Sequence, residues 1–209
     1  MYAAHVVAEA QGHFVAGRLE QAAEACVRGL AAAPESWDLR FLAATVEMQR
    51  GHPAEARPRL QALLATPNLD RTRRLLACNN LACGDLELAA DDPGLLTEAD
   101  QLSTEAVTWA PWGTCYRATR GAVLVDLGRT EEGMALLESA RAEALPAYAQ
   151  AFLACFLARA ESARGHADRA AEYLADARRV DPHCPQLKRM AETIPATEAS
   201  AGDAAPGPP

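Results

Sequence analysis

Histidine, cysteine and serine are the side chains with which this chain could cleave a substrate or bind a metal. None of the five histidines is followed three or four residues later by a second histidine or cysteine, as zinc ligands on one helix would be. The six cysteines occur singly, without a CxxC pair. The sequence also lacks the GxSxG, GxxxxGKS/T and GxGxxG motifs of hydrolases and nucleotide-binding loops. We therefore expect no catalytic residue, no metal and no cofactor, and so no enzyme.

The composition argues against two classes of partner. The 209 residues carry a formal net charge of −8 and a pI near 5.2, whereas nucleic acids and anionic membranes attract basic surfaces. The dense basic cluster Arg71, Arg73 and Arg74 is interpreted as a solvated face that pairs with acids such as Asp70. Single cysteines favour a reducing compartment, and the sequence shows neither a signal-type start nor a run of eighteen apolar residues. We expect a cytoplasmic protein without direct membrane insertion.

A repeated spacing of glycine, alanine and proline predicts the helices on which any binding residue would lie. Gly17 and Gly165 are each followed by an alanine after five residues and by a proline after seventeen. Gly51 and Gly128 share the frame, with a small residue seven before and five after the glycine. A turn glycine, small residues where two helices cross and a proline that ends the second helix describe a helical hairpin of about 34 residues.

An all-α solenoid of αα-hairpins follows from this spacing. We predict one helical repeat domain over residues 1–194, with about five hairpins and a short C-terminal cap helix, followed by a disordered tail over 195–209. The third hairpin carries about five extra residues, so its turn should bulge as a loop from Asp91 to Leu96. The hairpins are expected at about 3–36, 37–70, 71–111, 112–146 and 147–184, and the cap at 185–194.

The 34-residue period, the small residues around the turn glycines and the closing prolines resemble the tetratricopeptide repeat (TPR) family over about residues 3–184. The resemblance implies a non-enzymatic scaffold or adaptor that binds a protein segment in a concave groove. A narrower likeness, in the segment from Ala99 to Ala140, is to TPR domains that follow bacterial membrane-embedded site-2-type metalloproteases. Because this chain has no HExxH motif, that likeness implies the alternative function: an accessory or regulatory subunit of an enzyme on a separate chain, with a membrane protein as partner.

In a TPR-like array the first helix of each hairpin lines the concave face, so positions thirteen, ten, nine and six residues before each turn glycine are candidates. The candidate protein-binding residues are Phe41, Thr45, Thr119, Phe156 and Arg159 by this count, together with Asn79, Asn80 and Cys83, which are placed from the helix itself because of the insertion in the third hairpin. Asparagine can donate and accept hydrogen bonds at once, which suits holding an extended peptide backbone. The alternative is that one of the two asparagines caps or bridges neighbouring helices. The basic pattern with which some TPR proteins clamp a C-terminal carboxylate is absent.

Arg120 stands where three other hairpins carry an apolar residue, so we expect its guanidinium to be buried; the alternative is a solvated side chain, since the first hairpin carries Glu9 at this place. A buried arginine needs an acidic partner. The preceding hairpin offers Glu98, Asp100 and Glu105.

Trp109 and Trp112 bracket Pro111 at the end of the third hairpin. Tryptophan covers a large apolar area at a junction. We predict that the two indole rings wedge two hairpins together rather than bind a ligand.

Overall fold

The computed structural model describes residues 2–194 of the chain. Within this range the backbone forms eleven helices and no strand, which confirms the all-α fold class. In chain order the helices are α1 (Tyr2–Val15), α2 (Leu19–Ala32), α3 (Trp37–Gln49), α4 (Pro53–Leu64), α5 (Arg71–Leu88), α6 (Gly94–Trp109), α7 (Thr114–Asp126), α8 (Thr130–Arg141), α9 (Ala147–Ala163), α10 (Ala167–Val180) and α11 (Gln186–Thr193). The tail expected over 195–209 lies outside the described residues. Across the described range, no helix is both long enough and apolar enough to cross a membrane.

A left-handed glycine ends the first helix of four hairpins. Gly17, Gly51, Gly128 and Gly165 have φ values of 71°, 81°, 78° and 81°, a backbone conformation that costs other residues energy. In each turn the amide after the glycine donates to the carbonyl oxygen four residues before the glycine. This Schellman arrangement satisfies the end of the first helix and sets the angle at which the second begins. The repeated glycines of the sequence are therefore the hairpin turns.

The third hairpin has a longer connection in place of that turn. Helix α5 runs to Leu88 and α6 begins at Gly94, so residues 89–93 join them. The Asp92 carboxylate accepts a hydrogen bond from the Gly94 amide at 3.0 Å, which helps to start α6. The extra length predicted for this turn is present, although α6 already includes Leu95 and Leu96.

Small residues let the two helices of each hairpin approach closely. Ala10, Ala44 and Ala158 are completely buried, each seven residues before its turn glycine. In the fourth hairpin Gly121 takes this place and faces Gly133 of α8. Close approach of helix axes allows leucine, valine and alanine to fill the core of a chain with only 5% aromatic residues.

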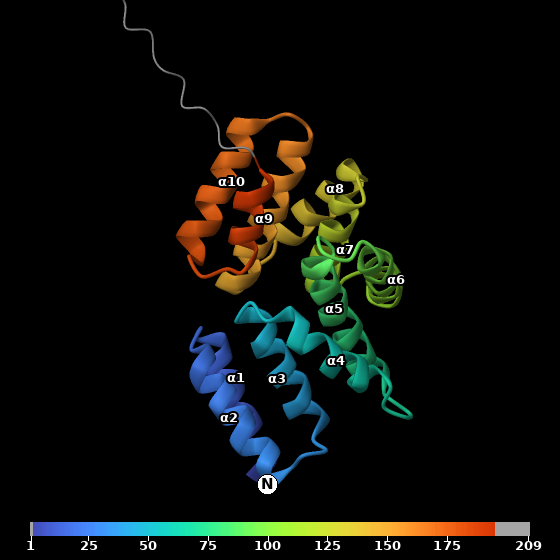
Figure 1. Cartoon of the computed structure of the whole chain (residues 1–209), viewed down its shortest axis with the longest axis vertical. Coiled ribbons are helices and arrows are strands. Elements are labelled where there is room, and N and C mark those ends of the chain that lie inside the picture. Colours follow the sequence, from blue (N-terminus) through green and yellow to red (C-terminus); the bar gives the residue numbers. More distant parts are fainter. Residues whose placement is uncertain (1, 195–209) are drawn as a thin grey trace, which may run out of the picture.

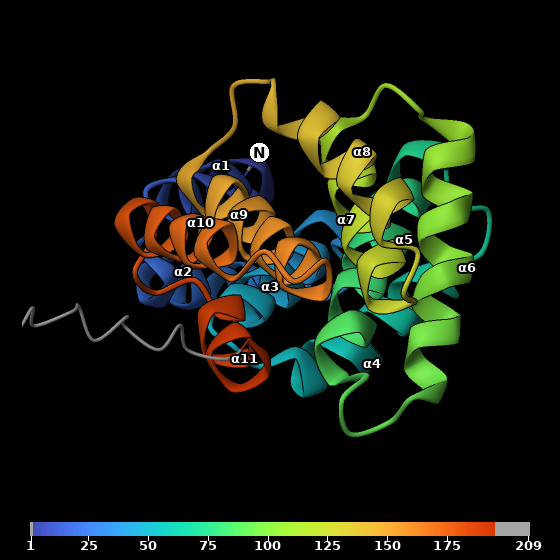
Figure 2. The ribbon, with the colours of Figure 1, turned by 90° about the horizontal axis from the view of Figure 1, so that it is seen from above.

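Each hairpin packs against the next along the chain. A small rotation between successive hairpins gives the array its curvature. Figure 1 shows the first two hairpins at one end of the molecule and the fifth hairpin with α11 at the other. Seen along the long axis, α9 and α10 lie over α1 to α3, while α5 to α8 form the other side (Figure 2). The ring centroids of Phe14 in α1 and Tyr148 in α9 are 5.5 Å apart. The curvature thus brings the first and fifth hairpins into contact.

The cap helix α11 packs on α9 and α10 and buries Met190 completely. Its polar side chains reach further back along the array. Arg189 donates to the carboxylate of Asp126 in α7, and Gln186 donates to Glu87 in α5 at 3.1 Å. Helix α11 therefore also lies against first helices of the third and fourth hairpins.

Arg120 is buried in α7, as expected, and Asp100 of α6 is its acidic partner. The guanidinium donates to the Asp100 carboxylate, to the Asp100 carbonyl oxygen at 3.2 Å and to the Ser103 hydroxyl at 3.2 Å. The other two candidate acids pair with different arginines. This confirms the register predicted for the fourth hairpin at that position.

The basic cluster at the start of α5 pairs with acids around it, as predicted. Arg73 lies 3.5 Å from Asp70 and 3.3 Å from Asp38 of α3, and Arg74 lies 2.5 Å from Glu105 of α6. The cluster is solvated and ties α5 to its two neighbouring helices.

The prediction that Trp109 and Trp112 wedge two hairpins together is wrong, because these residues are 50% and 74% exposed. Tyr116 fills the junction instead. It packs against the buried cluster that contains Leu75, and its ring occupies the space that a Cβ on Gly113 would need. With that space taken, the indole rings remain on the outside.

Candidate functional site

Thr45, Asn79 and Asn80 form a hydrogen-bonded group between α3 and α5 on the concave face. The Asn80 amide donates to the Thr45 hydroxyl oxygen at 2.8 Å, and Asn79 donates to Asn80 Oδ1 at 3.3 Å. The Thr45 hydroxyl in turn donates to the Phe41 carbonyl oxygen at 2.9 Å. Asn79 is only 8% exposed, and its Oδ1 has no hydrogen-bond partner among residues 2–194. Asn80 therefore bridges two helices, whereas Asn79 keeps an unused acceptor.

Cys83 and Thr119 make the next polar contact along this face, between α5 and α7. The Cys83 sulfur and the Thr119 hydroxyl oxygen are 3.2 Å apart. Burial raises the pKa of the Cys83 thiol to about 12, which favours the protonated thiol over the reactive thiolate at neutral pH. Cys115, near the start of α7, is exposed, yet burial by surrounding protein also raises the pKa of its thiol.

The two aromatic candidates differ in accessibility. Phe41 is half-buried and stacks on Trp37, with ring centroids 4.9 Å apart. Phe156 is completely buried in the core that the fifth hairpin shares, and the guanidinium of Arg189 from α11 lies 5.8 Å from its ring centroid. Its selection as a surface residue is therefore corrected: the position turns inward beneath the cap helix.

Arg159 belongs to a charge network beneath the same cap helix. It donates to Asp126, which also accepts from Arg189 of α11. Helix α11 thus covers the C-terminal part of the concave face. The candidates that the structure brings together lie on α3, α5 and α7, and they are Phe41, Thr45, Asn79, Asn80, Cys83 and Thr119.

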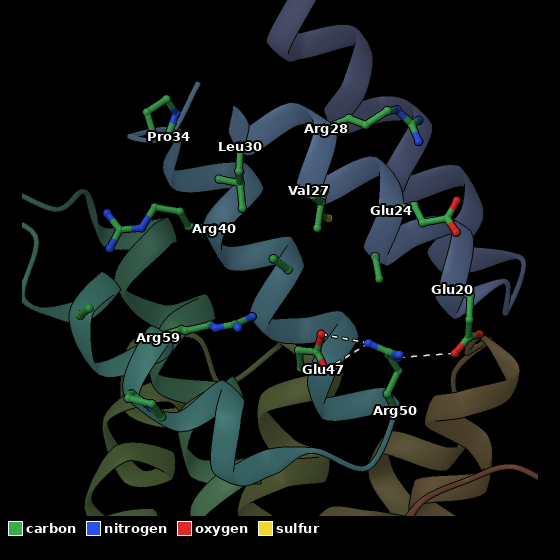
Figure 3. A pocket seen from close by; sticks show the side chains of 15 residues that line it. Glu20, Glu24, Val27, Arg28, Leu30, Pro34, Arg40, Glu47, Arg50 and Arg59 are labelled. Carbon is green, nitrogen blue, oxygen red and sulfur yellow. Dashed lines mark hydrogen bonds and ion pairs between the residues drawn. The ribbon is translucent and has the colours of Figure 1, made fainter. Parts of the chain in front are cut away.

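A second candidate site is a groove between α2 and α4, with α3 as its floor, which we call the α2/α4 groove (Figure 3). Its volume is about 1040 Å³, in the range of ligand-binding clefts. Small or apolar side chains cover its walls and floor, namely Ala23, Val27, Leu30, Ala43, Pro58 and Ala62. Val27 is 68% exposed. The groove is therefore an accessible apolar surface.

Charges of opposite sign stand on the two sides of the α2/α4 groove. Glu20 and Glu24 come from α2, as does Arg28, whose charge is paired with Glu9 of α1, whereas Arg40 comes from α3 and Arg59 from α4. Arg59 points toward the middle of the groove in Figure 3. Among the described residues, neither Arg59 nor Glu24 has an ion-pair partner. Each side of the groove thus offers a charge that can pair with a bound segment.

A charge cluster closes one end of the α2/α4 groove. Glu47 accepts from Arg50 at 3.1 Å and lies 2.9 Å from the His52 ring, while Arg50 also lies 3.5 Å from Glu20. Burial alone would raise the pKa of Glu47, but hydrogen bonds and attraction from His52 and Arg50 outweigh it and lower that pKa. The cluster thus joins the turn of the second hairpin, at Arg50 and His52, to α2 of the first hairpin through Glu20.

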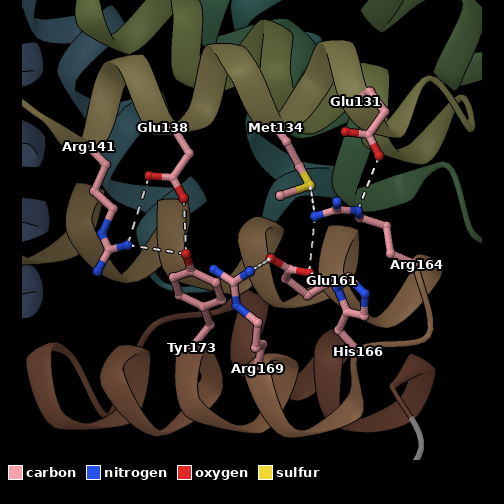
Figure 4. Close-up of polar contacts among 9 residues, drawn as sticks. All are labelled: Glu131, Met134, Glu138, Arg141, Glu161, Arg164, His166, Arg169 and Tyr173. Carbon is pink, nitrogen blue, oxygen red and sulfur yellow. Dashed lines mark hydrogen bonds and ion pairs between the residues drawn. The ribbon is translucent and has the colours of Figure 1, made fainter.

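The fourth and fifth hairpins contain the same cluster (Figure 4). Glu161 lies 3.3 Å from Arg164 and 2.6 Å from His166, and Arg164 lies 3.1 Å from Glu131 of α8. Arg169 adds a further contact to Glu161 at 3.2 Å. The Glu161 side chain is completely buried.

Here, however, the groove between the two second helices is filled. The Tyr173 hydroxyl of α10 donates to Glu138 of α8 at 2.9 Å and accepts from Arg141 at 3.2 Å. Counted from the turn glycines, Tyr173 stands in the place of Arg59 and Glu138 in the place of Val27. A hollow of about 320 Å³ remains beside Tyr173. The chain therefore builds this groove twice and leaves the first copy open.

Sequence reasoning missed both the charge cluster and the α2/α4 groove. The cluster has a visible signal, because the segments EMQRGH and ESARGH that end at His52 and His166 share Glu, Arg, Gly and His at the same spacing. The groove would have required comparing second helices position by position, where Val27 and Leu30 of α2 correspond to Glu138 and Arg141 of α8.

The described residues contain no cluster of three or more His, Cys, Asp and Glu side chains that could hold a metal ion. The repeated turns, the paired helices and the curved face define a helical-hairpin solenoid of the TPR type. The tetratricopeptide repeat family model matches residues 14–77. This family is typically non-catalytic.

Solved TPR structures share the fold over most of the chain. TTC0263, a thermophilic TPR protein in Thermus thermophilus, is 21% identical with a TM-score of 0.66, covering 92% of this chain and 98% of that one. A tetratricopeptide repeat protein from Parabacteroides merdae ATCC 43184 is 16% identical with a TM-score of 0.60, covering 90% and 69%. No curated protein sequence matches significantly.

Proposed function

We propose that the chain is a non-enzymatic scaffold that binds an extended segment of a partner protein on the concave face formed by α3, α5 and α7. The TPR fold is a general protein–protein interaction scaffold. The choice of this face rests on one observation, the buried Asn79 Oδ1 without a hydrogen-bond donor. An unsatisfied buried acceptor costs about 1 to 3 kcal/mol, and the backbone amide of a bound peptide would supply the missing donor.

The surrounding side chains suit an extended peptide. Asn80 and Thr45 offer further donors and acceptors, and Phe41 offers an apolar contact beside them. Because Asn79 Oδ1 is buried, the peptide amide reaches it when the half-buried Asn80 turns aside. Binding then exchanges the two hydrogen bonds that Asn80 makes with Thr45 and Asn79 for hydrogen bonds with the peptide backbone, and it also supplies a donor to Asn79 Oδ1.

The alternative function, an accessory subunit of an enzyme, differs from the scaffold function only in which protein supplies the bound segment. In that case the peptide would belong to an enzyme on another chain. The same concave face would bind it, so one experiment on this face addresses both functions.

Cys115 gives that experiment an attachment point. It is the exposed cysteine among the six, so a photoreactive maleimide can be placed there on the full chain. Segments crosslinked in the native cytoplasm are identified by mass spectrometry, synthesised, and titrated against unlabelled protein. We expect Asn79→Ala/Asn80→Ala to weaken binding of such a peptide by about tenfold or more, the equivalent of at least one lost hydrogen bond.

The control variant is Glu24→Ala, which lies on the opposite surface and should bind the peptide like the wild type. Circular dichroism must show that the double variant stays folded. A folded double variant that binds every crosslinked peptide with unchanged affinity would refute the concave site.

A further inference from the structure

We infer that the α2/α4 groove is a second docking surface, independent of the concave face, and that it binds an amphipathic helix of a partner protein. The walls and floor of this groove are helices, so nearly all of their backbone amides and carbonyls are already paired. An extended peptide would find no backbone partners there. A helix satisfies its own backbone and needs only an apolar face.

The dimensions of the groove agree with this occupant. Helices α2 and α4 contain 14 and 12 residues, which at 1.5 Å per residue gives walls of about 18 to 21 Å, or three to four helical turns. Ala23, Ala43 and Ala62 lie one on each of the three helices. Such small side chains let another helix axis approach to about 8 to 10 Å.

The charges define the chemistry of the bound helix. One wall carries Glu24 and the other Arg59, and neither has an ion-pair partner within residues 2–194. A helix that places basic residues on one flank of its apolar stripe and acidic residues on the other would pair with both walls. Turning the helix end for end exchanges its flanks, so whichever flank is basic, one of the two directions places it beside Glu24 and the acidic flank beside Arg59. What matters is that the two flanks have opposite signs.

The fourth and fifth hairpins show how this chain closes such a groove. Tyr173, Glu138 and Arg141 bridge α8 and α10 with hydrogen bonds. At the corresponding places of the first and second hairpins stand Arg59, Val27 and Leu30, and no side-chain hydrogen bond or ion pair joins α2 to α4 among the described residues. The open groove thus leaves exposed an apolar surface that the same fold elsewhere covers.

The test uses the full chain and three designed helical peptides of about 14 residues, held helical by a side-chain crosslink because free helices of this length are marginal. All three carry the same leucine and alanine stripe. The mixed peptide has glutamate on one flank and lysine on the other, the acidic peptide has glutamate on both, and the basic peptide has lysine on both. Affinities are measured by fluorescence anisotropy.

We expect the wild type to bind the mixed peptide about tenfold more tightly than the other two. Arg59→Glu makes both walls acidic and should shift the preference to the basic peptide, whereas Glu24→Arg should shift it to the acidic one. Val27→Glu/Leu30→Arg/Arg59→Tyr copies the filled groove of the later hairpins and should abolish binding. Asn79→Ala/Asn80→Ala is the matched control and should leave binding unchanged.

Equal affinities of the wild type for the three peptides, no measurable binding of any of them, or undiminished binding to the folded groove-filling variant would each overturn the inference. Light scattering on the same variants checks for a second copy of the chain as occupant. A dimer of the wild type that the groove-filling variant loses would also overturn it. Since the asparagine variant is titrated in parallel, failure here is distinguishable from failure of the concave site.

Discussion

Gly133 of α8 faces Gly121 of α7 so closely that a Cβ on Gly133 would lie 2.7 Å from the Gly121 carbonyl oxygen. Backbone atoms of two packed helices cannot move aside cheaply. We therefore expect Gly133→Ala to lower the free energy of unfolding by about 1 to 3 kcal/mol, measured by urea denaturation. Gly12→Ala is the control, because nothing lies within 4 Å of a Cβ there, and it should raise stability by about 0.5 to 1 kcal/mol. Similar losses in both variants would contradict this account of the fourth hairpin.

The pair of Arg120 and Asp100 predicts an asymmetry between its two partners. Asp100→Ala should cost on the order of 2 kcal/mol, because it leaves the buried guanidinium with neutral acceptors alone. Arg120→Leu should cost less, since an apolar side chain can fill the same space. Glu105→Ala, which removes a surface ion pair with Arg74, should change stability by less than about 1 kcal/mol. An Asp100→Ala variant as stable as the wild type would show that solvent reaches Arg120.

Asp85 predicts how stability depends on pH. Burial of its carboxyl raises its pKa to about 6, although Arg57 of α4 donates to it at 2.6 Å, and the nearby Glu98 of α6 raises it further. The folded state therefore holds a proton that the unfolded chain, with a pKa of about 3.9, releases. The stability from this group is full below about pH 4 and is lost as the pH rises to about 6, by about 3 kcal/mol in total.

Asp85→Asn removes that titration. Unfolding free energies of the wild type and of this variant should diverge between about pH 4 and pH 6, with the variant gaining relative to the wild type as the pH rises. Parallel profiles across this range would mean that Asp85 stays ionised beside Arg57.

Glu161 and Glu47 test the repeated charge cluster in two environments. Glu161 is completely buried in contact with Arg164, Arg169 and His166, so Glu161→Gln should cost on the order of 3 kcal/mol. The Glu47 side chain is 17% exposed, and Glu47→Gln should cost about 1 kcal/mol. Thermal unfolding of the two variants makes the comparison. The reverse order would show that burial does not govern the strength of this cluster.

The hairpin frame could be predicted because it depends on local rules. Gly17, Gly51, Gly128 and Gly165 adopt a conformation that favours glycine, and their spacing alone fixes where the helices pair. The burial of Arg120 followed from the same spacing.

The concave candidates could be predicted only in part, because side-chain accessibility depends on distant elements. Phe156 lies nine residues before its turn glycine, as Leu42 and Thr119 do, and all three are buried; Arg189 of α11 additionally lies over the Phe156 ring. Trp109 and Trp112 are exposed because Tyr116, which follows them in the sequence, fills the junction between the third and fourth hairpins. The α2/α4 groove escaped prediction for a related reason: it is defined by side chains that are missing from the space between two helices.

The contact between Phe14 and Tyr148 changes how this array can come apart. In a straight solenoid each repeat contacts only the repeats next to it. The terminal repeats therefore unfold first, and the remaining repeats keep most of their stability. Here α1 contacts α9 through Phe14 and Tyr148, so detaching α1 from the array exposes Tyr148 near the other end of the chain. The contact also joins residues far apart in sequence, which lengthens the average loop that folding must close. We therefore expect the first and fifth hairpins to be coupled through this aromatic pair, so that loss of order in one lowers the stability of the other.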